Sequence, residues 1–503
     1  MAHLLAGLKL KEIVKISIRY KHGPNHWSVL KKKKTAKDKA LDHFDEYYGS
    51  VYGESWEGIR AALLDEKTKY MAVVNNFSDV QRIQTELQLL GAIHLKSLYN
   101  VFKEDEKNYQ NSEPTLSQDI ENPMDDIIKN LQLSELESFY PNDHVLSQTS
   151  LTSEEDEEDN KSLIETNKPL QPVELQSIEK SLNEIEIDND RLIQSSSDQS
   201  MLYEYVPATK LKGLNDYVLE SDYYNFYNKG ADFKINIVEE STLPFPEHLH
   251  VYTFEDNNYT RFPSPKLGST GVLDYYLFDG GSILPVLALD IKLGDVVLDM
   301  CAAPGGKALA ILQTLMPRVL VANDVMESRV NKLNNVVRQY MLNASKLGNM
   351  LYVTENDARY IDDTNVFNKI LVDVPCTTDR HMVHSVENNM FKPTRLKERI
   401  NLPNVQSSIL MNALKLVKVG GTVVYATCSL SPIQNDGVVQ VALKNVWEET
   451  TSVMVVKDMS KALSPLKCLY QFANIGLKYG HIVVPTHENN WGPMYFCKIE
   501  RIQ

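Results

Sequence analysis

Two cysteines in the second half of the chain follow apolar runs, and each is a candidate nucleophile. Cys376 lies in Val-Asp-Val-Pro-Cys-Thr-Thr-Asp (372–379), and Cys428 lies in Val-Val-Tyr-Ala-Thr-Cys-Ser-Leu (423–430). Such runs are typical of buried parallel strands that end in a loop. Ligands of open α/β sheets bind beyond the carboxyl ends of these strands, so both thiols could face one pocket. A thiolate in that pocket could act in covalent catalysis.

A second chemical signature is a small-residue turn, Asp-Met-Cys-Ala-Ala-Pro-Gly-Gly-Lys (299–307). It lacks the spacing of a dinucleotide fingerprint and of a P-loop, which disfavours NAD and ATP. Asp324 comes 19 residues after Gly305, where an acid can hold a ribose through its hydroxyls. A Rossmann-like site without phosphate-binding glycines suits S-adenosylmethionine. The alternative is a tight turn in which the two glycines only permit packing.

Two further residues extend this candidate cofactor site. Asp357 follows the third expected strand and could receive an adenine amine, and Arg329 lies one turn into the helix after Asp324. A lone Asp at a strand end is a helix N-cap about as often as it is a ligand.

The elements that would position these residues alternate between strand and helix from about residue 295. Strands alternating with helices predict an α/β fold with a mainly parallel, doubly wound sheet. Gly420-Gly421 is expected to stop the helix that precedes the Cys428 strand. The expected strands are 296–300, 319–322, 350–353, 370–372, 422–426, 482–484 and 494–499, and the expected helices are 306–315, 328–342 and 402–416.

Charge and composition divide the chain. Residues 101–200 hold 25 acidic and 7 basic side chains, so the other residues keep 42 acidic and 45 basic ones and are nearly neutral. Few aromatic residues and long acidic runs predict a disordered insert. Five cysteines without a Cys-x-x-Cys pair argue against a disulfide framework and against a zinc site, and no apolar run suggests a membrane span.

The first 35 residues are basic and poor in acids, with a rough amphipathic spacing of leucines. This pattern is typical of a mitochondrial transit segment, and a basic tail that binds nucleic acid is the alternative. The predicted organisation is a transit segment (1–35), a helical N-terminal region (36–103), the acidic insert (104–200), an extension packing on the catalytic domain (201–290) and a Rossmann-like methyltransferase domain (291–503).

Three motifs together resemble the NOP/SUN family of RNA cytosine-5 methyltransferases, and most closely its mitochondrial ribosomal-RNA branch. They are the turn at 299–307, Asp-Val-Pro-Cys-Thr-Thr-Asp-Arg-His (373–381) and Ala-Thr-Cys-Ser-Leu-Ser-Pro-x-Gln-Asn (426–435). The resemblance is dense over about 245–501 and does not cover the acidic insert. It implies a mitochondrial matrix enzyme that methylates C5 of a cytosine in small-subunit ribosomal RNA and supports ribosome assembly.

The resemblance also assigns roles to residues. Cys428 would attack the base, Cys376 would assist product release, and Asp373 would contact the base near N3. The residues it places around S-adenosylmethionine are Gly305, Gly306, Lys307, Asp324, Arg329, Asp357 and Asp373.

Substrate and partner expectations complete this hypothesis. Four basic residues between the cysteine motifs could hold RNA phosphates, and a solvated helix face is the alternative; they are Lys392, Arg395, Lys397 and Arg399. No appended RNA-binding domain is evident, and in the mitochondrial branch its absence goes with a helical-repeat partner of the mitochondrial termination-factor type. The rival functions are a mitochondrial or cytosolic tRNA cytosine-5 methyltransferase and a non-catalytic ribosome-assembly factor.

Overall fold

The computed structural model describes residues 34–111, 235–341 and 350–503, with side chains of 107–111 left out. The expected transit segment up to residue 33, the acidic insert from residue 112 and the extension up to residue 234 lie outside the described residues.

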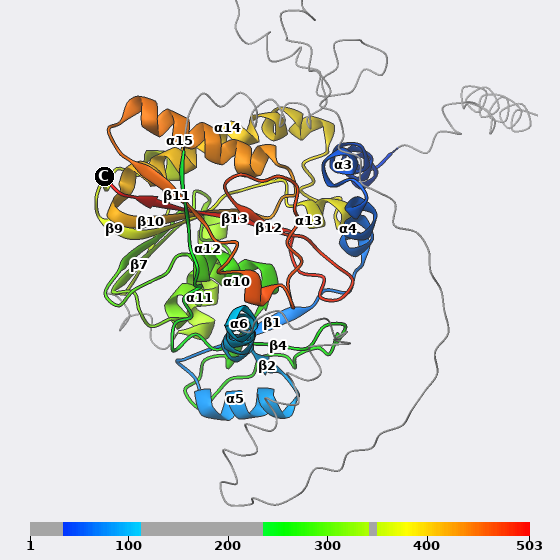
Figure 1. The fold of residues 1–503 in the computed structure, drawn as a ribbon, viewed down its shortest axis with the longest axis vertical. Coiled ribbons are helices and arrows are strands. Elements are labelled where there is room, and N and C mark those ends of the chain that lie inside the picture. Colours follow the sequence, from blue (N-terminus) through cyan, green and yellow to red (C-terminus); the bar gives the residue numbers. More distant parts are fainter. Residues whose placement is uncertain (1–33, 112–234, 342–349) are drawn as a thin grey trace, which may run out of the picture. The chain divides into compact units, whose positions relative to one another are not determined.

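A large mixed sheet forms the centre of the described part of the chain (Figure 1). Its strand order is β3-β11-β13-β10-β9-β6-β7-β8, and β12 pairs with β13. The strands from β10 to β8 in this order are parallel, whereas β13 runs antiparallel to β10 and β11. This confirms the predicted α/β fold with a mainly parallel sheet. The bounds are β3 Asn236–Glu239, β6 Val296–Asp299, β7 Val319–Asn323, β8 Leu351–Thr354, β9 Phe367–Asp373, β10 Val417–Thr427, β11 Met454–Asp458, β12 His481–Val483 and β13 Met494–Arg501.

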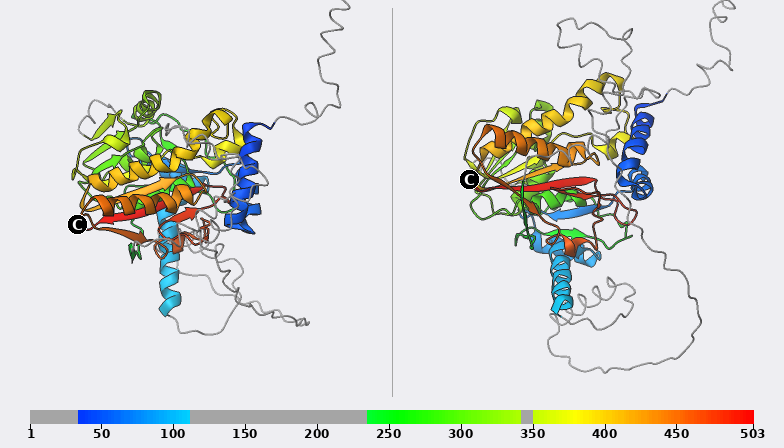
Figure 2. Two further views of the ribbon diagram at one scale, coloured as in Figure 1. Left: turned by 90° about the horizontal axis from the view of Figure 1, so that it is seen from above. Right: turned by 45° about the horizontal axis from the view of Figure 1, so that its top comes forward.

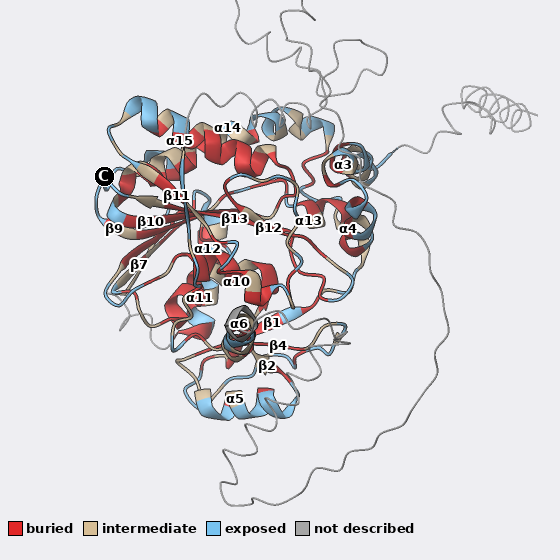
Figure 3. Cartoon of the chain, in the orientation of Figure 1, coloured by how far each residue is buried: buried red, intermediate tan, exposed pale blue. Residues whose placement is uncertain are grey.

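Helices cover both faces of this sheet. In Figure 1, α14 and α15 lie on one face and α10 and α11 on the other, and both views of Figure 2 show α14 and α15 side by side. The inner sides of α14 and α15 are buried and their outer sides carry exposed residues (Figure 3), as expected for amphipathic helices, whereas α10 is buried throughout and α11 has no exposed residue. The bounds are α10 Ile283–Ala288, α11 Gly306–Gln313, α12 Glu327–Tyr340, α13 Asp379–His384, α14 Leu396–Leu416 and α15 Val438–Glu449.

The chain reverses its direction of travel across the sheet between β6 and β9. It passes from β6 to β7 and β8 on one side and then returns to β9 on the other side of β6. Ligands of doubly wound folds bind outside the carboxyl ends of the strands at such a switch point. The strands β6 and β9 flank this switch point, and they end at Asp299 and Asp373.

A second, four-stranded sheet joins distant parts of the sequence in the order β2-β4-β1-β5. The region 36–103 therefore holds two strands besides the helices that we predicted. Local sequence does not predict these two strands, because their partners, β4 and β5, lie more than 150 residues further along the chain. The bounds are α3 Ala36–Tyr52, α4 Ser55–Leu64, β1 Tyr70–Val74, α5 Val80–Leu89, β2 Ile93–His94, α6 Leu95–Asn111, β4 Val251–Thr253 and β5 Tyr275–Asp279.

The prediction that Gly420-Gly421 stops a helix is wrong. Helix α14 already ends at Leu416, and β10 begins at Val417 with a shift of register before Thr422. Gly420 has φ +77°, and a Cβ on Gly421 would lie 2.7 Å from the carbonyl oxygen of Asn368. The glycines therefore permit an irregularity within a strand.

Two predicted boundaries also differ from the structure. Helix α6 continues to Asn111, past the predicted start of the insert at 104, and β3 pairs with β11 in the large sheet although it precedes residue 291. Edge pairing of this kind cannot be foreseen from local composition. No helix among the described residues is long and apolar enough to cross a membrane.

Candidate active site

The predicted cofactor turn connects β6 to α11 directly at the switch point. Gly305 has φ +116° at the start of α11, a conformation that favours glycine. A Cβ on Gly305 would lie 2.8 Å from Leu333, and a Cβ on Gly306 would lie 2.8 Å from Phe278. Both glycines are thus required by the path and packing of the turn.

A pocket of about 170 Å³ opens beside this turn. Three predicted cofactor residues line it, namely Asp324, Arg329 and Asp357. Its apolar wall could not be predicted from the sequence, because α14 supplies Val405 and Ile409 from a distant part of the chain. A pocket with an acidic end and an apolar wall suits a nucleoside.

Buried carboxylate oxygens near this pocket lack hydrogen-bond donors. Both oxygens of Asp299 and Oδ2 of Asp324 are buried without a hydrogen bond. Arg329 lies 3.4 Å from Asp324 Oδ2 as an ion pair, while its other nitrogen donates to the carbonyl of Ala303 at 2.6 Å. Buried polar groups are normally paired, so these oxygens fit a ligand that brings hydroxyl or ammonium donors. The donor set agrees with the ribose and amino-acid groups of S-adenosylmethionine.

The ionised form of the Asp299 side chain is unfavourable in the folded protein. Burial, followed by the charge of Asp373, raises its pKa to about 8. Because this pKa is higher in the folded than in the unfolded chain, ionisation of Asp299 disfavours folding increasingly from about pH 4 to pH 8.

We expect the Asp299→Asn variant to be more stable than the wild type at pH 8, by about 1–3 kcal/mol in free energy of unfolding. This gain in the free energy of unfolding should shrink towards pH 5, because Asp299 of the folded wild type is then protonated and as uncharged as the asparagine. Urea unfolding at both pH values, without S-adenosylmethionine, measures this. Exposed Asp363→Asn should change little at either pH, and an equal gain at both pH values for Asp299→Asn would contradict the raised pKa.

An ion pair connects the cofactor turn to the first cysteine loop. Lys307 Nζ lies 2.8 Å from Asp373 Oδ2. Burial lowers the pKa of Lys307, but the charge of Asp373 and its hydrogen bond raise that pKa by more, so the ammonium form is favoured. Lys307 therefore holds Asp373 at the switch point.

The two cysteines lie together, as the sequence pattern suggested. They follow neighbouring parallel strands, β9 and β10, and their Sγ atoms are 2.9 Å apart as free thiols. The hydrogen bond with Cys376 raises the pKa of Cys428 well above its ordinary value, and burial and Asp373 raise it further. Cys428 is thus protonated at neutral pH in this state, and its attack requires loss of that proton.

Asp379 joins the two cysteine loops, a role that the sequence did not reveal. Its buried carboxylate accepts hydrogen bonds from Tyr48 of α3 at 2.7 Å and from Thr377 at 2.5 Å. From the Cys428 side it accepts bonds from the Ser429 hydroxyl at 3.2 Å and the Leu430 N–H at 2.7 Å. Asp379 therefore fixes the position of one cysteine loop relative to the other.

We expect the Asp379→Asn variant to lose about 10²-fold in single-turnover rate, the scale of a displacement of about 1 Å in an active site. Asparagine turns two acceptor positions into donors that face the fixed Leu430 N–H and its neighbours. The affinity for S-adenosylmethionine, measured by calorimetry, should stay within about twofold because the network lies outside the cofactor pocket. Tyr48→Phe removes one donor and should give a milder loss. Wild-type turnover by Asp379→Asn would show that the network is dispensable.

The four candidate RNA-binding residues lie at and before the start of α14. Arg395 pairs with Glu398 at 2.6 Å, and the Arg399 guanidinium lies 4.3 Å from the Phe391 ring centre. Lys397 is exposed and Lys392 is half-buried. Two of these cations, Arg395 and Arg399, therefore take part in local contacts.

Comparisons with known proteins agree with this geometry. Residues 286–499 match the family described as "16S rRNA methyltransferase RsmB/F". The chain is 32% identical over 483 residues to "5-cytosine rRNA methyltransferase nsun-4" of Caenorhabditis elegans, which covers 93% of each chain. It is 44% identical over 266 residues to the mouse "5-cytosine rRNA methyltransferase NSUN4", covering 52% of this chain and 69% of that protein. It is 36% identical to the zebrafish "tRNA (cytosine(34)-C(5))-methyltransferase, mitochondrial", covering 48% of this chain and 65% of that one.

Proposed function

Because this chain belongs to the RsmB/F, or NOP/SUN, family of RNA cytosine-5 methyltransferases, we propose that it methylates C5 of a cytosine in mitochondrial small-subunit ribosomal RNA. The reaction depends on S-adenosylmethionine. The observation that carries the proposal is the pair of thiols 2.9 Å apart, placed beside Asp373 and next to a nucleoside-sized pocket at the switch point.

The cofactor would be held by Asp324, Arg329 and Asp357 in the pocket, with Gly305 and Gly306 shaping the turn. The ion pair of Lys307 and Asp373 would complete the site. When bound there, S-adenosylmethionine supplies an electrophilic methyl group.

The cysteines would perform the covalent chemistry in a fixed order. Cys428 gives up its proton, its sulfur bonds to C6 of the cytosine, and N3 gains a proton beside Asp373 while the electron pair moves to C5. C5, now nucleophilic, takes the methyl group while the bond from that group to the sulfonium sulfur breaks. Cys376 then assists removal of the C5 proton; the C5–C6 double bond re-forms, the C6–S bond breaks, and the N3 proton is released.

The target cytosine must leave its stack to reach these thiols. Unstacking costs a few kcal/mol and is easiest in loops and single strands. A folded ribosomal RNA offers such positions.

Three features support ribosomal over transfer RNA and a mitochondrial matrix location. The relative with 44% identity and the relative matched over 93% of both chains are named for ribosomal RNA. The zebrafish relative is named mitochondrial, and the first 35 residues have the composition of a transit segment. A role in assembly of the small subunit would follow from binding its RNA before the subunit is complete. The resemblance to the mitochondrial branch supports a helical-repeat partner that supplies RNA affinity. Specific RNA binding by the isolated chain as tight as that of a reconstituted complex would rule this partner out.

Bisulfite sequencing of mitochondrial rRNA and tRNA after depletion of the protein tests the substrate. One cytosine of small-subunit rRNA should lose its methylation, and re-expression of the wild type but not of a Cys428→Ala variant should restore it. Loss confined to tRNA would favour the tRNA enzyme. Assembly rescued by the inactive variant, with no methylation change on depletion, would favour the non-catalytic assembly factor.

A further inference from the structure

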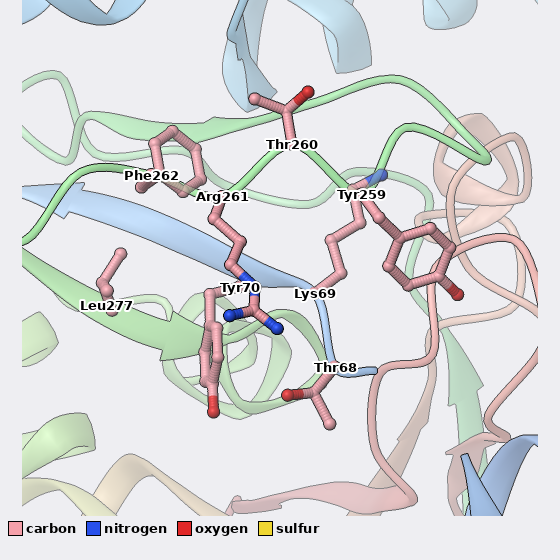
Figure 4. A pocket seen from close by; sticks show the side chains of 8 residues that line it. All are labelled: Thr68, Lys69, Tyr70, Tyr259, Thr260, Arg261, Phe262 and Leu277. Carbon is pink, nitrogen blue, oxygen red and sulfur yellow. The ribbon is translucent and has the colours of Figure 1, made fainter. Parts of the chain in front are cut away.

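A second pocket, of about 280 Å³, lies at the start of β1 (Figure 4). It is lined by the segment before and at β1, by the segment after β4, and by one residue of β5, namely Thr68, Lys69, Tyr70, Tyr259, Thr260, Arg261, Phe262 and Leu277. Its volume is near the lower end of that of ligand pockets, enough for one nucleotide unit. No role in the proposed methyl transfer uses this pocket.

The pocket presents a cation and aromatic rings at its opening. Figure 4 shows the Arg261 side chain extending into it, and Arg261 has no ion pair with the described residues. Tyr70 is 47% exposed, and the Tyr259 hydroxyl donates to the carbonyl of His487, which fixes its ring. An exposed guanidinium beside an exposed tyrosine ring is the combination with which proteins bind single-stranded nucleic acid.

The other charges restrict where an anion could bind. Lys69 is buried, and its ammonium already donates to the carbonyls of Phe254 and Glu255 and to Asn489 Oδ1. Asp65, Glu488 and the Arg380 guanidinium lie near Tyr259, so that end of the pocket carries two carboxylates against one cation. A phosphate would therefore bind at Arg261.

One loop connects this pocket to the candidate active site. Asn489 accepts from Lys69, and Asn490 donates to the carbonyl of Lys67 at 2.6 Å. Arg380 of α13, next to Asp379, donates to Asn490 Oδ1 at 2.8 Å. The pocket and the helix that follows the Cys376 loop are thus held by the same short segment, Asn489–Asn490.

We propose that this pocket binds one nucleotide of the substrate RNA outside the target cytosine, with its phosphate on Arg261 and its base against Tyr70. The inference rests on the proposed RNA methyltransferase function and adds a substrate subsite to it. Tyr70 and Arg261 are exposed, so their replacement should leave the fold intact.

The test compares Arg261→Ala with Arg318→Ala in the full-length chain. Arg318 is exposed at the amino end of β7, on the edge of the sheet opposite to the cysteines. Anisotropy of a fluorescein-labelled oligocytidylate gives the affinity, and methylation of a small-subunit rRNA transcript gives KM and kcat. Arg261→Ala should raise Kd and KM about tenfold and leave kcat unchanged. It should also lower the slope of log Kd against log salt concentration by about one, whereas Arg318→Ala should leave Kd, KM, kcat and this slope as in the wild type.

Substitutions of Tyr70 test whether a base of the RNA stacks on its ring. Tyr70→Ala should raise Kd about tenfold, whereas Tyr70→Phe should bind the RNA with wild-type affinity because it keeps the ring. Equal Kd, KM and salt slope in wild type and Arg261→Ala would overturn the proposal, as would equal losses in both arginine variants. A wild type that binds RNA in this manner but never methylates it would leave the subsite standing and refute the proposed function instead.

Discussion

We expect the Cys428→Ala variant to transfer no measurable methyl group and to form no covalent complex with RNA. Loss of the nucleophile in other covalent enzymes lowers turnover by up to about 10⁶-fold, and no other thiol could take its place here without reversing the roles of the pair. Single-turnover transfer of a tritiated methyl group to the rRNA transcript measures the rate, and denaturing gels measure the complex.

Two controls separate this loss from a general effect of removing a thiol. Cys468→Ala, at a partly buried cysteine whose thiol donates to the carbonyl of Pro465, should turn over as the wild type does. Binding of S-adenosylmethionine to Cys428→Ala should persist, since Cys428 does not line the cofactor pocket. Methylation by Cys428→Ala at more than a trace would show that the nucleophile is assigned wrongly.

The second large effect is expected for Cys376→Ala, which should accumulate a covalent protein–RNA complex. Without the assisting thiol, the C5 proton and the Cys428 sulfur leave slowly, while attack and methyl transfer proceed. The complex should resist denaturing gels, should contain the transferred methyl group and should be absent from the Cys376→Ala/Cys428→Ala double variant. Normal turnover by Cys376→Ala would remove its role in product release.

The geometry adds a pH dependence to this second prediction. The hydrogen bond with Cys376 is the largest cause of the raised pKa of Cys428, so its removal should lower that pKa and increase the thiolate fraction. Complex formation by Cys376→Ala should therefore begin at lower pH than the wild-type single-turnover reaction. Coincident pH profiles would show that the two thiols do not influence each other in the RNA-bound state.

The sequence predicted the parts of the site that depend on local pattern. Strands buried on both faces must be continuous apolar runs, so β6, β9 and β10 were recognisable together with the residues that end them. The turn at 299–307 and the two cysteine motifs are contiguous in the chain, and their resemblance to a family could be read directly. At Gly420-Gly421 the prediction from local sequence was wrong, because a glycine pair is compatible both with the end of a helix and with an irregularity in a strand.

Contacts between distant segments were decided by the tertiary structure alone. The order of β9 and β10 places the Cys376 and Cys428 sulfurs 2.9 Å apart, and the same arrangement brings Lys307 to Asp373. Tyr48 reaches Asp379 across 331 residues, a separation over which no periodicity carries information. The raised pKa of Asp299 likewise follows from burial, which packing determines. The chain thus encodes its reactive groups locally, whereas their mutual positions and protonation depend on how the strands are ordered and what covers them.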